Sequence, residues 1–154
     1  MRIKICGITR PDQAQAIAQL GVDTLGFICV SQTPRYIAPD LIRAIAETLT
    51  AASLPVARIG VFANASLEEV IRIAKEARFT GVQLHGQEDP TFCQQLRQQL
   101  PEMETIKSFR IQTTADLEST VAYEPHVDTL LLDAYHPGKL GGTGQAIDWC
   151  CCSI

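Results

Sequence analysis

Six short runs of β-branched and aliphatic residues recur along this chain at nearly regular intervals, and this alternation constrains the fold more than any other feature. Several runs are apolar on consecutive residues, as in Leu130, Leu131 and Leu132, which is typical of strands buried on both faces of a parallel sheet. The pattern predicts strands over residues 3–6, 25–30, 57–62, 82–85, 105–109 and 129–133.

Helical patterns separate these runs. Pro11 and Pro39 each stand in the first turn of an expected helix, and Ser66 with Glu69 has the spacing of a capping box. Strands that alternate with helices form right-handed crossover units and a parallel sheet. The expected helices cover residues 11–20, 39–49, 66 onwards, 89–100 and, more weakly, 113–123.

The periodicity leaves two α/β architectures open. One is a doubly wound open sheet, and the other is a (β/α) barrel, which needs eight strands. This chain has room for about six strand–helix units. Spacing alone does not choose between the two.

Composition narrows the class of protein. The chain has 154 residues, of which 46% are hydrophobic and 19% are charged, with a formal net charge of −4. We therefore expect one folded domain over residues 1–154, neither disordered nor built to bind nucleic acid. No apolar run approaches the roughly 20 residues of a membrane span, and no secretory signal precedes the first strand. The six cysteines form no C-x-x-C pair, so we expect reduced thiols in the cytoplasm.

Residues whose side chains are suited to catalysis or ligand binding follow the expected strands. In parallel α/β folds, functional groups gather at the carboxyl ends of strands, where this chain has Cys6, Arg35, Gln83, His85 and Asp133. A thiol and a carboxylate there are suited to act as base and acid, and an arginine binds a carboxylate or phosphate. Taken singly, each has a commoner explanation, such as a buried cysteine or a helix-capping aspartate. The set therefore matters more than any one member.

Taken in order, the motifs at these strand ends resemble those of the phosphoribosylanthranilate isomerase family, which acts in tryptophan biosynthesis. They span residues 2–149 and come in the family's order and approximate spacing. They are Lys4-Ile5-Cys6-Gly7-Ile8-Thr9, Gly26-Phe27-Ile28, Pro34-Arg35-Tyr36-Ile37, Gly60-Val61-Phe62, Val82-Gln83-Leu84-His85-Gly86, Leu131-Leu132-Asp133, Gly141-Gly142-Thr143-Gly144 and Asp148-Trp149. The resemblance implies the (β/α)8 TIM-barrel fold rather than the open sheet.

The resemblance also implies a reaction, the Amadori rearrangement of N-(5-phosphoribosyl)anthranilate to the 1-deoxyribulose 5-phosphate. It assigns the general base to Cys6 and the general acid to Asp133, so each must be held in the protonation state that is minor for a free side chain at neutral pH. The resemblance also implies that Arg35 binds the anthranilate carboxylate of the substrate. It places Gln83, His85 and Gly142 in the pocket. It implies no metal and no organic cofactor.

The match breaks after the sixth unit, where the family continues to strands seven and eight and this chain reads Cys-Cys-Cys-Ser-Ile. In phosphate-binding barrels the loops after those strands usually hold the phosphate. We therefore expect an incomplete barrel domain that associates through unclosed sheet edges, is strained, or is only marginally stable as a monomer. We expect any activity to be weak. Two alternatives stay open: a non-catalytic fragment or pseudoenzyme of the family, and an open-sheet binding domain unrelated to isomerisation.

Overall fold

The computed structural model describes residues 1–135, which form six strands and five α-helices. Each strand except the last is followed by a helix, as the alternation predicted. The elements are β1 (Lys4–Cys6), α1 (Pro11–Gln19), β2 (Thr24–Ile28), α2 (Pro39–Ala51), β3 (Ala57–Phe62), α3 (Leu67–Glu76), β4 (Gly81–Leu84), α4 (Pro90–Gln99), β5 (Glu104–Ile111), α5 (Thr114–Glu118), a 3-10 helix (Ser119–His126) and β6 (Thr129–Ala134).

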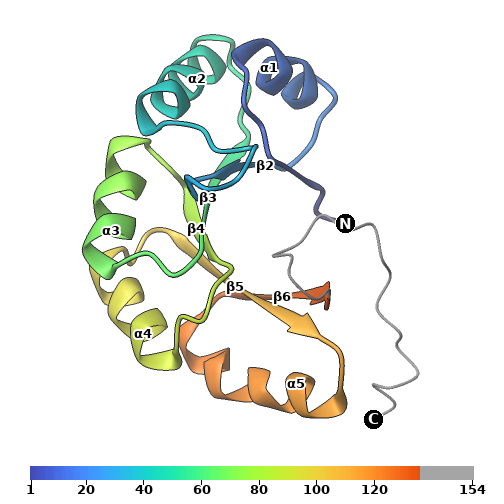
Figure 1. The fold of residues 1–154 in the computed structure, drawn as a ribbon. Helices are drawn as coiled ribbons and strands as arrows, with labels where there is room; N and C mark the ends of the chain where they lie inside the picture. Colours follow the sequence, from blue (N-terminus) through green and yellow to red (C-terminus); the bar gives the residue numbers. More distant parts are fainter. Residues whose placement is uncertain (136–154) are drawn as a thin grey trace.

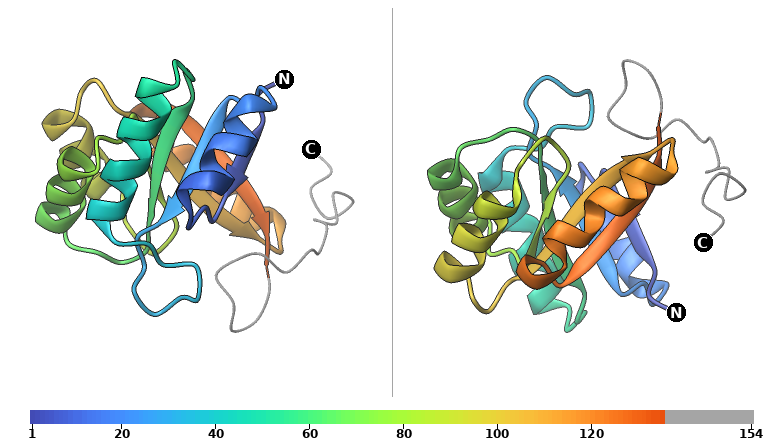
Figure 2. Two further views of the ribbon diagram at one scale, coloured as in Figure 1. Left: turned by 90° about the horizontal axis from the view of Figure 1, so that it is seen from above. Right: turned by 90° about the horizontal axis from the view of Figure 1, so that it is seen from below.

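The strands form a single parallel sheet in the order β1-β2-β3-β4-β5-β6. Every strand lies beside the next one in sequence, so the strand order never reverses as it does in a doubly wound sheet. The helices lie around the outer side of the curved sheet (Figure 1), and β1 and β6 lie on the same side of the molecule in both views of Figure 2. The described residues are therefore a half-barrel, which agrees with the barrel and not with the open sheet.

The first residues of the helices agree with their sequence signals more closely than the last residues of helices and strands do. The Ser66 side chain accepts from the backbone N–H of Glu69, and Asp89 caps α4 in the same way. The second strand ends two residues earlier than expected, because the carbonyl of Ile28 accepts from the backbone N–H of Ile37. That bond folds the intervening loop back over the end of β2.

The apolar core lies between the sheet and its helices. Phe27 and Phe62 are fully buried there, and the Phe79 ring stacks on Phe27 with ring centroids 6.1 Å apart. Gly60 makes room for that ring, since an added Cβ would lie 2.2 Å from it. Cys93 on α4 is fully buried in this core, and burial raises the pKa of its thiol to about 11.

Polar side chains cross the concave side of the sheet at its amino-terminal end. Arg2, just before β1, donates from both terminal nitrogens to the carboxylate of Glu104 on β5, at 2.6 and 2.7 Å. The Arg2 guanidinium also donates to Thr24, and Thr129 donates to Glu104, so these contacts join β2, β5 and β6 to the segment before β1. The hydrogen bonds from Arg2 hold the pKa of Glu104 below its ordinary value of 4.5.

This ion pair predicts an acid-sensitive contribution to stability. A carboxylate whose pKa is lowered by folding stabilises the native state above its ordinary pKa, and that contribution disappears as the pH falls through the folded-state value. We expect Glu104→Gln to lower the free energy of unfolding at pH 7 and to flatten its decline below pH ~4.5. Urea titrations between pH 7 and pH 3 measure this, with the exposed Glu102→Gln as control; identical pH profiles for the two variants would contradict it.

Candidate active site

The residues predicted from the motifs come from strands that converge on one rim. Alternation along β1 puts Lys4 and Cys6 on the same face of the sheet, and Lys4 reaches across to Gln83 on β4. Because that contact crosses the interior of the half-barrel, Cys6 also faces the interior. His85 follows Gln83 by two residues and shares its side of the sheet.

Gly26 on β2 makes room for the Cys6 side chain. The two residues are register partners in neighbouring strands, and a Cβ at Gly26 would lie 2.7 Å from the Cys6 sulfur and 3.1 Å from its Cα. The thiol occupies the space that a side chain would need, and the cysteine remains exposed at the rim. Gly26 was part of a motif in the sequence, but its packing role follows only from the register.

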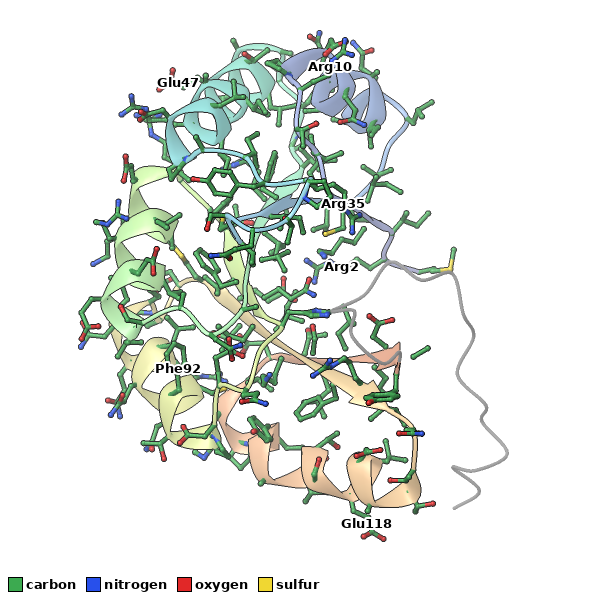
Figure 3. The ribbon with its side chains drawn as sticks, viewed as in Figure 1. Arg2, Arg10, Arg35, Glu47, Phe92 and Glu118 are labelled. Atoms are coloured by element: carbon green, nitrogen blue, oxygen red, sulfur yellow. The ribbon has the colours of Figure 1, made fainter. Side chains whose placement is uncertain are left out.

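Arg35 lies over the end of β1. Gly7 has a φ of +87°, and a Cβ there would lie 2.8 Å from Cδ and 2.9 Å from Nη1 of Arg35. The guanidinium is therefore packed over the residue that follows Cys6. Figure 3 shows Arg35 on the inner side of the sheet, whereas Glu47 and Phe92 lie on helices around the outside.

The buried Gln83 amide is the centre of a polar network. Its Oε1 accepts from Lys4 Nζ at 2.6 Å, and its Nε2 donates to Ser108 Oγ at 2.9 Å. The same Nε2 lies 3.2 Å from Nδ1 of His85. These contacts join β1, β4 and β5 in one layer above the Arg2 ion pair.

His85 links this network to Asp133. Its Nε2 lies 3.9 Å from Oδ2 of Asp133, while Oδ1 accepts from the backbone N–H of Ala134 at 2.9 Å. The imidazole is 13% exposed and the carboxylate 31% exposed, so both reach the rim. The structure therefore brings His85 and Asp133 together. Cys6 and Asp133 stand at the ends of the two edge strands, β1 and β6, across the open side of the half-barrel.

A second charged group near the rim was not expected from the sequence. Lys107 on β5 and Glu88, before α4, form an ion pair at 3.2 Å with side chains only 3% and 2% exposed. Lys107 also donates to the carbonyl of Gly86 at 2.9 Å, and Glu88 accepts from the backbone N–H groups of Asn64 and Gly86. The pair thus anchors the loop that carries His85. A lysine within an otherwise buried strand was the one sequence signal for it.

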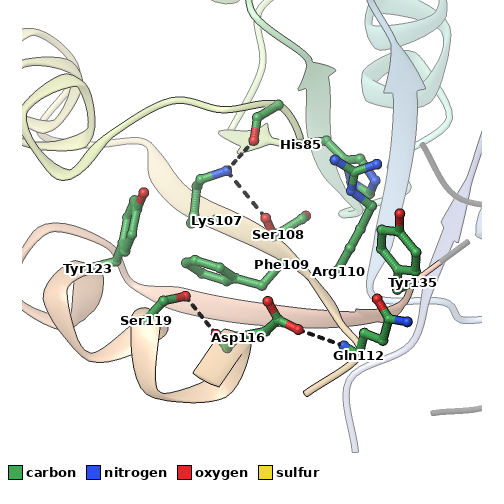
Figure 4. Close-up of a pocket in the computed structure, with 11 residues that line it drawn as sticks. His85, Lys107, Ser108, Phe109, Arg110, Gln112, Asp116, Ser119, Tyr123 and Tyr135 are labelled. Carbon is green, nitrogen blue, oxygen red and sulfur yellow. Dashed lines mark hydrogen bonds between the residues drawn. The ribbon is translucent and has the colours of Figure 1, made fainter. Parts of the chain in front are cut away.

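A cleft of about 370 Å³ opens beside this ion pair (Figure 4). Of the five predicted site residues within residues 1–135, only His85 lines it. Phe109 and Tyr123 form part of its wall, and the Lys107 ammonium lies 5.4 Å from the Phe109 ring centroid. The cleft extends the rim on the side of β5 and α5.

Within the described part of the chain, no three histidine, cysteine or acidic side chains are grouped so as to hold a metal ion. None of the helices described there is long and apolar enough to cross a bilayer. Gly142, the remaining predicted pocket residue, lies outside the described residues.

Comparisons with known proteins give a family for this arrangement. A family model described as N-(5'phosphoribosyl)anthranilate (PRA) isomerase matches residues 3–153. The N-(5'-phosphoribosyl)anthranilate isomerase of Rippkaea orientalis is 54% identical over 149 residues, which cover 97% of this chain and 68% of that protein. The chain belongs to the N-(5'-phosphoribosyl)anthranilate isomerase family. Its relatives are thus isomerases of tryptophan biosynthesis, as the motifs predicted.

Solved structures agree with the fold. The crystal structure of phosphoribosyl anthranilate isomerase from Thermotoga maritima matches with a TM-score of 0.83 and 31% identity, covering 98% of this chain and 69% of that one. A second isomerase structure, in complex with reduced 1-(o-carboxyphenylamino)-1-deoxyribulose 5-phosphate, matches with a TM-score of 0.76 and 31% identity, covering 88% of this chain and 66% of that one. The chain thus spans about two thirds of the length of these isomerases.

The buried Lys107–Glu88 pair predicts a large stability effect. Removing one member leaves an uncompensated buried charge, so we expect Lys107→Met to lower the free energy of unfolding by roughly 3–5 kcal/mol. The matched control is Arg72→Met, which removes an exposed ion pair with Glu76 and is expected to cost no more than about 1 kcal/mol. Urea unfolding followed by circular dichroism measures both, and equal costs would contradict the prediction.

Proposed function

We propose that this chain catalyses the Amadori rearrangement of N-(5-phosphoribosyl)anthranilate with Cys6 as general base and Asp133 as general acid. The observation that carries the proposal is the contact between Lys4 and Gln83. It shows that the face of β1 with Lys4 and Cys6 points into the same interior that the His85–Asp133 pair faces. An acid and a base that face one interior can act on the same sugar.

The chemistry needs two proton transfers. Asp133 protonates the furanose ring oxygen, the bond from that oxygen to C1 breaks, and the anthranilate nitrogen becomes the nitrogen of a Schiff base. The Cys6 thiolate then removes the proton from C2, and the electron pair moves into the imine to give an enolamine. Tautomerisation of the enolamine gives the ketone. The imine accepts the electrons itself, so the proposal needs no metal or organic cofactor.

The remaining residues bind the substrate in this proposal. Arg35 holds the anthranilate carboxylate through its planar guanidinium, which suits a bidentate contact. Its position over Gly7 places that contact next to Cys6. Gln83 and His85 contact the sugar from the interior next to Asp133 in this proposal. An isomerase structure that matches this chain carries the reduced product analogue, whose carboxyphenyl group is the kind of ligand that Arg35 would recognise.

The proposal predicts that Cys6→Ser and Asp133→Asn each lower kcat by at least about 100-fold, the usual contribution of a positioned acid or base. Fluorescence assays of purified variants measure the turnover of the anthranilate substrate. Cys29→Ala is the control thiol, since burial raises the pKa of Cys29 to about 12 and keeps it protonated.

Full turnover by either catalytic variant would contradict the assigned roles. Calorimetric titration with the reduced product analogue distinguishes a chain that binds its ligand without catalysis from one that catalyses the reaction. If the wild-type chain binds the analogue and turns over no substrate, the chain is a non-catalytic member of the family.

We further propose that the chain works in the cytoplasm and self-associates through the edges of its half-barrel. Within residues 1–135, β1 and β6 each pair with a strand on one side only. Unpaired strand edges promote association. Ile5 on β1 is 38% exposed, and Ile3, just before β1, is 43% exposed.

Self-association predicts a concentration-dependent mass in sedimentation velocity experiments. We expect Ile5→Lys to shift the equilibrium toward the monomer, because a charge on an edge strand opposes edge-to-edge pairing. Leu20→Lys, on an exposed residue after α1, is the control and leaves the equilibrium unchanged. A monomeric wild-type chain at every concentration would contradict the proposal.

A further inference from the structure

The orientation of the buried Gln83 amide is set by Lys4. The Lys4 ammonium lies 2.6 Å from Oε1 of Gln83, and an ammonium group donates hydrogen bonds but accepts none. The carbonyl oxygen of the amide must therefore face Lys4. Its nitrogen then faces the opposite side, toward β5 and the end of β4.

The amide nitrogen in turn sets the protonation of His85. Gln83 Nε2 carries two hydrogens and has two neighbours at hydrogen-bond distance, Ser108 Oγ at 2.9 Å and His85 Nδ1 at 3.2 Å. A proton on Nδ1 would point at another N–H group, so Nδ1 acts as the acceptor. A neutral imidazole with Nδ1 as acceptor carries its proton on Nε2.

That proton faces the carboxyl group of Asp133. His85 Nε2 lies 3.9 Å from Oδ2, while the other oxygen is already bonded to the backbone N–H of Ala134. The separation exceeds an ordinary N–H···O bond by roughly 1 Å. A small movement of either side chain thus gives Asp133 a second donor.

We propose that Lys4 is a positioning residue for the isomerisation. By fixing the Gln83 amide, it holds His85 in the tautomer that presents Nε2–H to Asp133. When Asp133 has given its proton to the sugar ring, this donor stabilises the carboxylate that remains. An interaction that strengthens as charge develops raises kcat rather than substrate affinity. The proposal rests on the role of Asp133 as general acid.

Steady-state kinetics test the effect on turnover. We expect Lys4→Met to lower kcat about tenfold, the effect of one lost hydrogen bond, with KM unchanged. Lys4→Arg keeps a donor and is expected to restore most of kcat. Lys75→Met, on the exposed side of α3, is the control. An unchanged kcat in Lys4→Met, or a loss confined to KM, would overturn the proposal.

Nitrogen NMR of the chain labelled with 15N-histidine tests the tautomer without any need for turnover. The His85 signals are assigned by comparison with His85→Asn and recorded at a pH where the ring is neutral. We expect the Nε2-protonated form in the wild type, a mixture of tautomers in Lys4→Met, and the Nδ1-protonated form in Gln83→Glu, where a carboxylate replaces the donor.

These two measurements separate failure of this proposal from failure of the proposed function. An Nδ1-protonated His85 in the wild type, or no change of tautomer in Lys4→Met, overturns the role of Lys4 whatever the activity. Full turnover by Asp133→Asn overturns the assignment of the acid, and with it the catalytic use of His85, even where the tautomer behaves as expected. Circular dichroism of each variant confirms that it is folded.

Discussion

Polar side chains on the inner face of the half-barrel must hydrogen-bond to one another, and this pairing governs how the strand ends are arranged. A buried polar group without a partner is costly, so each one must find a complementary group on a strand that the curvature brings near. The Lys4–Gln83 contact satisfies that requirement for the buried Gln83 amide, and the more exposed Arg2–Glu104 pair forms the next layer. Because they define the inner face of β1, they also decide that Cys6 points into the half-barrel.

At the rim above these layers, close packing against glycines fixes side-chain positions, as hydrogen bonds and ion pairs also do. Gly26 leaves room for the Cys6 thiol, and Gly7 leaves room for the Arg35 side chain. On the other side, the Lys107–Glu88 pair anchors the loop that carries His85. Groups that exchange protons with a small sugar need fixed positions, and rigid supporting contacts provide them.

Much of the fold could be predicted because its signals are local. Apolar runs marked the strands, and the capping residues Ser66 and Asp89 marked where helices begin. Ends were less predictable, since the last residues of β2 depend on a loop folding back and α5 continues as a 3-10 helix to His126. The family followed from motifs spread over the chain. Gly142 was predicted as a pocket residue on the same basis, and it lies outside the described residues.

Local patterns and motifs were enough to predict the alternation of strands and helices, the family and the candidate residues Cys6, Arg35, Gln83, His85 and Asp133. The folded arrangement was needed to show that the sheet winds in one direction and that Lys4 meets Gln83, 79 positions away. It also revealed the buried Lys107–Glu88 pair. This is because a local sequence pattern depends only on the secondary structure of its own segment and on which face of that segment is buried. Contacts between distant strands depend on the order and curvature of the whole sheet, which no single segment contains.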